Sequence, residues 1–227
     1  MKDTDHYPPP WSLNGEGFII PFLANKELVL NNGFIEEKDK PNFLGGIGAV
    51  MLVNYESSDV GPYFELLFIP GDFKETLSTN GNKKTKIFKR ITKIFVSSEI
   101  SIQEGRLNWA IPKEFANFSW EKDKNRTSVN ISNQSGKIFF KADFTKKFLP
   151  FPVTTKLYPI SLLQRSESGK LLNTQFSGNG FGKFSTMEIF EINKEIFPNL
   201  IDIAKFSFCL AVEKFKIVFP IPRIFNE

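Results

Sequence analysis

Apolar residues lie in short runs along this chain, and in two segments they alternate with polar residues. In Lys137–Phe144 and in Lys214–Phe219 the apolar side chains occupy every second position, with lysine or aspartate between most of them. Period-two alternation is typical of an antiparallel strand that buries one face and exposes the other. Both segments are therefore predicted to be half-buried strands.

Other apolar runs are shorter and more continuous, which favours strands buried on both faces. The run YFELLFI is followed directly by Pro70-Gly71, a pair that favours a turn and ends the predicted strand. The further predicted strands are Gly17–Ala24, Gly45–Val53, Tyr63–Ile69, Ile87–Ser97 and Gly182–Ile192.

Helical patterns are few and short. Phe197–Phe206 is predicted to be one helix, with Pro198 near its first turn, and Pro112–Phe118 to hold a single helical turn. Asp72–Lys86 is polar and predicts a loop, and Glu121–Gly136 predicts a loop or hairpin tip. Many short strands with few helices predict a mainly β (β-rich α+β) fold. We expect a single antiparallel β-barrel-like domain over residues 1–227, with a few short helices.

Composition adds one unusual feature, which is 26 phenylalanines against 3 tryptophans and 4 tyrosines. Phenylalanine has no polar atom that needs a partner, so a core rich in it can be dry. The net charge of +4 is spread among acids, without a basic stripe interleaved with aromatics, so we expect no nucleic-acid partner. No apolar stretch reaches the length of a membrane helix. We expect no membrane partner and a cytoplasmic location.

Several common catalytic arrangements find no support in the residues. His6 is the only histidine and Cys209 the only cysteine, so a histidine metal triad and a cysteine metal cluster are excluded. Cys209 lies in an apolar run and is predicted to be a buried, inert thiol. Gly178–Gly182 lacks the spacing of a phosphate-binding loop and is predicted to be a tight turn. We expect neither a metal nor a cofactor.

Lysine remains as a possible nucleophile, and Lys113 differs from the other lysines in its neighbours. It follows the run LNWAIP, which contains Trp109 and Ile111, and it precedes Phe115. An apolar setting disfavours the charged form of an amine and so favours a reactive one. The alternative is a surface lysine that lays its stem along a core turn and keeps its ammonium in water.

The residues around Lys113 resemble the acetoacetate decarboxylase-like superfamily. Gly105-Arg106 followed by Pro112-Lys113 is similar to that family's Gly-Arg…Pro-Lys segment, and Gly61-Pro62-Tyr63 with Glu65 to its central strands. Pro9-Pro10-Trp11 resembles the family's opening, and FKIVFPIP at Phe215–Pro222 its closing strand. The resemblance spans nearly the whole chain.

The resemblance implies that Lys113 forms a Schiff base with a carbonyl substrate and that Glu65 is the glutamate facing that substrate. It also implies a substrate site that includes Tyr63, Arg106 and Trp109. Glu99 lies at a family-like position, but a solvated carboxylate at a strand end is an equal alternative. Oligomers are common in the resembled family, which makes a homo-oligomer an expectation here.

Two further positions depart from the resembled family. Glu114 stands where the decarboxylase has a second lysine, and Glu16 where it has an arginine. An acidic neighbour raises the pKa of a lysine, although in an extended segment Glu114 and Lys113 point to opposite faces. We include Glu114 and Glu16 among the expected substrate-binding residues, and expect acetoacetate to be a poor substrate.

Two classes of function follow. In the first, the chain is a lyase in which Lys113 forms an iminium with a small carbonyl compound, for decarboxylation or for aldol or dehydration chemistry. This requires a large fall in the pKa of Lys113, since only the neutral amine attacks a carbonyl. In the second, the chain binds a hydrophobic or carbonyl-bearing ligand in its barrel without catalysis.

Overall fold

The computed structural model describes residues 6–79, 82–157 and 159–225 of the chain. Within these residues, eleven strands form the main sheet in the order β8-β7-β4-β3-β1-β16-β14-β11-β10-β9, with β15 paired to β1. Apart from the parallel pair β7 and β8, the neighbours are antiparallel. The strands of this sheet are β1 (Trp11–Ala24), β3 (Ile47–Ser57), β4 (Tyr63–Ile69), β7 (Lys93–Val96), β8 (Lys113–Phe115), β9 (Asn117–Asp123), β10 (Arg126–Ser132), β11 (Ile138–Thr154), β14 (Ser177–Ile192), β15 (Ala204–Ser207) and β16 (Cys209–Phe219).

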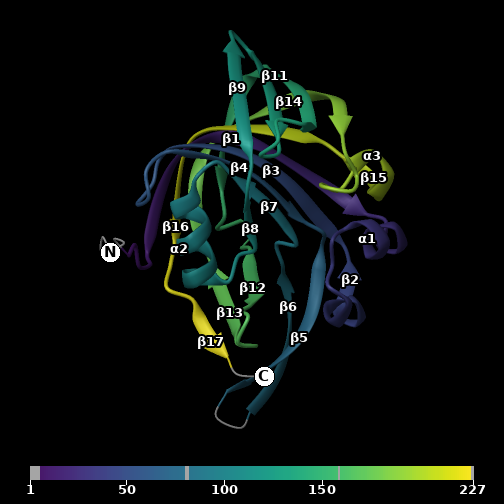
Figure 1. Cartoon of the computed structure of the whole chain (residues 1–227), viewed down its shortest axis with the longest axis vertical. Coiled ribbons are helices and arrows are strands. Elements are labelled where there is room, and N and C mark those ends of the chain that lie inside the picture. The colour runs from purple at the N-terminus through teal and green to yellow at the C-terminus, as the bar shows by residue number, and fades with distance from the viewer. Residues whose placement is uncertain (1–5, 80–81, 158, 226–227) are drawn as a thin grey trace.

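A second, smaller sheet has the order β17-β13-β12-β6-β5-β2. Its strands are β2 (Phe43–Gly45), β5 (Asp72–Thr79), β6 (Asn82–Lys89), β12 (Ser161–Arg165), β13 (Leu171–Gln175) and β17 (Arg223–Phe225). In Figure 1, β9, β11 and β14 lie at one end of the molecule, and β5, β13 and β17 lie towards the other end with the C-terminus. The helices are α1 (Lys26–Asn32), the 3-10 helix η1 (Glu37–Asn42), α2 (Glu99–Trp109) and α3 (Leu200–Ile203). No helix among the described residues is long and apolar enough to span a membrane.

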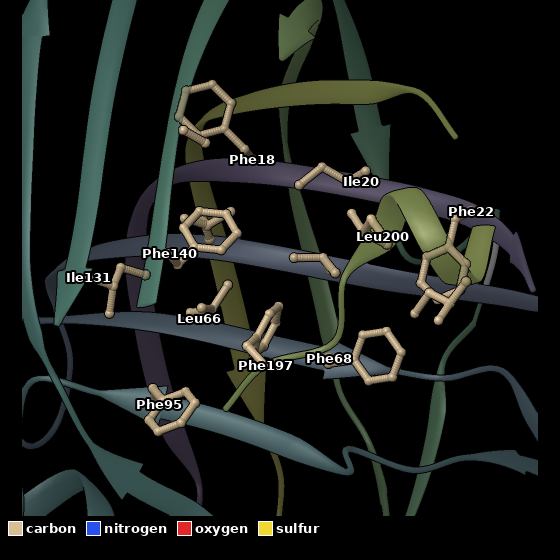
Figure 2. Packing of buried hydrophobic residues seen from close by; sticks show 14 of the residues in the cluster. Phe18, Ile20, Phe22, Leu66, Phe68, Phe95, Ile131, Phe140, Phe197 and Leu200 are labelled. Carbon is tan, nitrogen blue, oxygen red and sulfur yellow. The ribbon is translucent and has the colours of Figure 1, made fainter. Parts of the chain in front are cut away.

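The main sheet curls so that the central strands are covered on both faces. On one face, Phe18, Ile20 and Phe22 of β1 pack with side chains of β4, β10 and β11 in a cluster rich in phenylalanine (Figure 2). On the other face, residues of β1, β3 and β4 that point the opposite way form a second cluster, which includes Trp11 and Leu13 and also takes in Trp109 of the helix over residues 99–109. Burial on both faces explains why the apolar runs of β3 and β4 are continuous.

Helix α2 is the longest helix and packs beside β7 and β8. Its N-terminus is capped by Ser98, whose hydroxyl accepts a hydrogen bond from the backbone N–H of Ser101 at 3.2 Å. It ends where Ala110 adopts φ +54° and donates its N–H to the carbonyl of Arg106. The chain then turns at Pro112 and enters β8.

The predicted fold class is confirmed, because the chain is β-rich with a curled, barrel-like main sheet. Tyr63–Ile69 is β4 with the predicted bounds, and the predicted strands near residues 17–24, 137–144, 182–192 and 214–219 lie within longer strands. The predicted strand Gly45–Val53 is divided between β2 and β3, and Ile87–Ser97 between β6 and β7.

Other local predictions are wrong. Asp72–Lys86 is the hairpin of β5 and β6, not a loop, and the pair Asn80-Gly81 lies outside the described residues. Lys113–Phe115 is a strand paired with β7, not a helical turn. Gly178–Gly182 lies inside β14, not in a tight turn, and the predicted helix Phe197–Phe206 shortens to α3 followed by β15. In each case backbone pairing with another strand replaces the predicted conformation, and in the hairpin of β5 and β6 that partner is the next strand along the chain.

Candidate active site

An internal cavity of about 350 Å³ lies on the side of the main sheet opposite the phenylalanine-rich cluster. The period of two in each strand determines which side chains line it. On β4 these are Tyr63, Glu65, Leu67 and Ile69, while Phe64 and Leu66 point the other way, towards Phe118 and the phenylalanine-rich cluster. Tyr55 enters the cavity from β3 by the same alternation.

Lys113 enters the cavity from β8, the edge strand of the main sheet, and is only 4% exposed. Two residues of α2 determine its position. Gly105 has no side chain where the lysine stem passes, since a Cβ there would lie 2.8 Å from Cδ and 3.0 Å from Cε of Lys113. Arg106 donates from Nε and a terminal nitrogen to the carbonyl oxygen of Lys113, at 3.0 and 2.6 Å. The Gly-Arg pair of the sequence motif thus holds the lysine of the same motif.

The amine of Lys113 meets three oxygen atoms inside the cavity. Nζ lies 2.9 Å from Oγ of Ser101, 3.1 Å from Oε2 of Glu65 and 3.4 Å from the hydroxyl of Tyr63. Tyr55 donates its hydroxyl to the other oxygen of Glu65 at 3.1 Å. Each of these four partners is at most 4% exposed, so the ammonium and the carboxylate form a buried, hydrogen-bonded pair.

The surroundings of Lys113 act on its pKa in opposite directions. Burial lowers the pKa, but the oxygen atoms of Tyr63 and Glu65 stabilise the ammonium and outweigh burial, so the pKa lies above its ordinary value. The burial expected from the sequence is therefore present, while the expected fall in pKa is not. The raised pKa favours the ammonium form of Lys113 near neutral pH.

The hydroxyls on either side of Glu65 are held in their neutral form. Burial, the largest cause, raises the pKa of Tyr63 from 10.0 to about 12, and the charge of Lys113 only partly opposes this. Burial also raises the pKa of Tyr55 well above its ordinary value, with a contribution from Glu65. Both phenols are consequently hydrogen-bond donors near neutral pH.

The other residues predicted to bind substrate divide into two groups. Trp109 lines the cavity and donates its indole N–H to the carbonyl of Pro220 at 2.8 Å. Arg106, Glu114 and Glu16 do not line the cavity, and we withdraw them as substrate contacts. Arg106 holds the backbone of Lys113. Glu114 is exposed and pairs with Lys93 at 2.7 Å, because adjacent residues of a strand point to opposite faces.

Glu16 alternates along β1 with the residues that face the cavity. It pairs with Lys122 and Lys146. Glu99 is exposed in the first turn of α2, so it is a helix-start residue and not a strand-end one. His6 pairs with Glu104 at 2.8 Å. Cys209 is buried as predicted, and burial raises the pKa of its thiol to about 12.

Two residues at the lysine–glutamate pair escaped the sequence analysis, namely Ser101, which contacts the amine of Lys113, and Tyr55, which contacts Glu65. Tyr55 lies on the same face of β3 as Met51 and Val53, so extending the predicted strand by two residues would have found it. Ser101 contacts Lys113 only because α2 exists. Its one sequence signal was Ser98 followed by Glu99, a helix cap and an acidic first turn.

The fold and the cavity define a β-rich protein with a buried lysine–glutamate pair in an apolar pocket. A model of the acetoacetate decarboxylase (ADC) family matches residues 2–161, and the chain belongs to that family. A comparison with curated protein sequences found no match.

Solved structures similar to this one include acetoacetate decarboxylase from Legionella pneumophila, with 14% identity and a TM-score of 0.66 over 96% of this chain and 87% of that chain. The enduracididine biosynthesis enzyme MppR has 12% identity and a TM-score of 0.63, over 96% of this chain and 88% of that one. An acetoacetate decarboxylase-like enzyme from Sphingomonas wittichii RW1 has 9% identity and a TM-score of 0.60, over 96% and 93%. At these identities the likeness establishes the fold, and family membership supports an enzyme of the decarboxylase or related lyase type.

Proposed function

We propose that the protein is a Schiff-base-forming lyase in which Lys113 attacks a carbonyl compound and Glu65 carries the protons. The observation that carries this proposal is the 3.1 Å contact between Nζ of Lys113 and Oε2 of Glu65 in an apolar cavity. An amine and a base at this distance are the pair that covalent catalysis by lysine requires. MppR, which shares the fold, has been solved with pyruvate bound and with a condensation product of pyruvate and an aldehyde.

The proton balance uses Glu65 twice. First, Glu65 accepts a proton from the Lys113 ammonium, and the neutral amine attacks the carbonyl carbon to form a carbinolamine. Glu65 then returns that proton to the departing hydroxyl, so that one water leaves and a protonated imine remains. The ammonium and the carbonyl compound are thus converted into the iminium and water with no other reactant. The iminium is an electron sink for the bond that breaks next, in a decarboxylation or in an aldol or dehydration step.

The neighbouring hydroxyls have separate parts in this sequence. Tyr55 donates to Oε1 of Glu65 and so holds the carboxylate with Oε2 towards the amine. Ser101 and Tyr63 lie within 3.4 Å of the amine and orient it. The raised pKa of Lys113 disfavours the neutral amine, so in this proposal Glu65 takes the proton only transiently, while the carbonyl compound is attacked.

The experiment is borohydride trapping with a panel of aldehydes and ketones, read by mass spectrometry of the Lys113 peptide. We expect an adduct on Lys113 in the natural protein and none at that peptide in Lys113→Ala. In Glu65→Gln the adduct should form about 100-fold more slowly, in line with the loss of a general acid–base group. Trapping at Lys113 that is unchanged in Glu65→Gln would remove the role of Glu65. No Lys113 adduct with any carbonyl compound would overturn the proposal and favour a non-catalytic binder.

A further inference from the structure

The lysine–glutamate pair and two tyrosines form one polar region of the cavity, and the rest of the lining is mainly hydrocarbon, with Thr154, Thr155 and Asn179 as the polar exceptions. Among the described lining residues only Lys113 and Glu65 carry charge, and they neutralise each other at 3.1 Å. The walls away from this pair include Leu13, Ile19, Met51, Val212 and Ile217. Such walls gain by contact with apolar groups and offer nothing to a charged one.

A keto acid fits this lining poorly. In an α-keto or β-keto acid the carboxylate lies within two bonds of the carbonyl carbon, so attack by Lys113 would bring it beside the lysine–glutamate pair. The only cation among the described lining residues is Lys113 itself, whose charge Glu65 already balances. A second carboxylate would be buried without a cation of its own and repelled by Glu65.

The size of the cavity indicates a substrate with a sizeable apolar part. One molecule of liquid water occupies about 30 Å³, which is close to the volume of one methylene group, so the 350 Å³ cavity holds on the order of ten non-hydrogen atoms. A two-carbon or three-carbon compound bound at Lys113 would leave most of the apolar wall without contacts.

We propose that the substrate is an uncharged aldehyde or ketone whose carbonyl carries an apolar chain or ring of about eight to ten carbon atoms. The inference rests on the proposed Schiff-base function. The carbonyl carbon lies at Lys113 Nζ, between Glu65 and the hydroxyl of Tyr63, and the apolar part lies along Leu13, Met51 and Ile217. Without a carboxylate next to the carbonyl, the iminium serves bond changes at the adjacent carbon, which places the reaction in the aldol or dehydration class.

The test is a chain-length series of linear aldehydes, from acetaldehyde to dodecanal, trapped with borohydride on the full chain. The concentration giving half-maximal labelling of the Lys113 peptide is measured, with labelling of the exposed Lys124 as the internal reference. We expect this concentration to fall about fourfold per added methylene until about ten carbons, and then to change little. The Lys124 reference should show no such dependence. The α-keto and β-keto acids of matched chain length should need at least about tenfold higher concentrations.

Two substitutions on β16 provide a matched pair. Ile217 lines the cavity, whereas Val218 is 41% exposed on the opposite face of the strand. Ile217→Trp fills part of the apolar space and should move the optimum to shorter chains by about two carbons, because an indole adds roughly the volume of two to three methylenes. Val218→Trp should leave the series unchanged.

Three results would overturn the inference. Labelling of Lys113 that does not depend on chain length would leave the Schiff base in place and refute the apolar substrate. If a keto acid labels Lys113 at the same concentration as the aldehyde of matched chain length, the claim that the substrate is uncharged is refuted. The apolar chain and the Schiff base would then still stand. An absence of Lys113 labelling by every aldehyde would refute the proposed function, and this inference with it.

Discussion

The methylene groups of Lys113 pass α2 at Gly105. Because glycine has no side chain, the space beside it is free for the lysine side chain. A Cβ on Gly105 would lie 2.8 Å from Cδ of Lys113, closer than two carbon atoms approach without a shift. Because the atoms that such a Cβ would contact belong to the flexible side chain of Lys113, a substitution at Gly105 displaces the lysine side chain and not the backbone of α2. Gly105 therefore positions the side chain of Lys113.

Gly105→Ala tests this role. We expect the rate of Lys113 adduct formation to fall about 10- to 100-fold, because a displacement of about 1 Å at a reacting group has effects of this size. The free energy of unfolding should change by less than about 1 kcal/mol, since alanine also favours the helix over glycine. Trapping kinetics and urea unfolding measure the two effects. Gln103→Ala, at an exposed position of α2, is the control and should leave both unchanged.

At the scale of elements, a buried ion network joins η1, β5 and β12 to the segment between β6 and β7. Arg90, which is 3% exposed, donates to Asp39 at 3.0 Å and to Glu75 at 2.5 Å. Arg165 lies near both acids, at 3.6 and 3.9 Å. Burial, the largest influence, lowers the pKa of Arg90, while the two acids oppose it. The network holds the smaller sheet to η1.

Replacing Arg90 by methionine keeps the approximate volume and removes the charge. We expect Arg90→Met to lower the free energy of unfolding by about 3 kcal/mol, because Asp39 and Glu75 are then left partly uncompensated in a buried place. Arg126→Met is the matched control, since Arg126 is 56% exposed at its pair with Asp143 and its replacement should cost much less stability than that of Arg90. Chemical denaturation of the three proteins at neutral pH makes the comparison. Equal losses in the two variants would contradict a special role for the buried network.

At the scale of the whole molecule, the buried tyrosines couple the site to global stability at high pH. The pKa of Tyr63 is 10.0 in its ordinary state and about 12 in the folded protein. The folded state therefore holds the phenolic proton more tightly than the unfolded chain does. This contribution to stability is complete below pH 10 and is lost as the pH rises through about 12.

Tyr63→Phe should remove that dependence. Two pKa units correspond to about 3 kcal/mol in full, and about 2 kcal/mol of this is lost by pH 12, so between pH 8 and 12 the natural protein should lose about 2 kcal/mol more stability than the variant. Urea unfolding at several pH values, with an ultraviolet titration of tyrosinate, measures the difference. Parallel stability curves for the two proteins would show that Tyr63 titrates normally in the folded state.

The β-rich fold was predictable where one or both faces of a strand are apolar. The continuous run Tyr63–Ile69 and the alternating segments on β11 and β16 are strands as expected. The hairpin of β5 and β6 was not predictable in this way, because residues 82–87 are exposed on both faces. Its strands are held by backbone pairing, as at Thr76 and Thr85, which leaves no apolar pattern in the sequence.

Helix α2 was missed for a related reason. The residues that it buries have helical spacing, but several are small or polar, namely Ser101, Gly105 and Asn108. They are buried because they meet Lys113 and the backbone of Tyr7, and not because they are apolar. A search for hydrophobic periodicity therefore finds no helix there.

The sequence by itself determined which faces of the strands are apolar, and it singled out Lys113 and Glu65 as candidate site residues. These follow from the local pattern and from motifs along the chain. Only the tertiary structure brought Ser101 and Tyr55 to the lysine–glutamate pair and kept Arg106, Glu114 and Glu16 out of the cavity lining. It also decided the direction of the Lys113 pKa. Each of these depends on distances between side chains from different elements, and charge interactions and hydrogen bonds act through space and not along the chain.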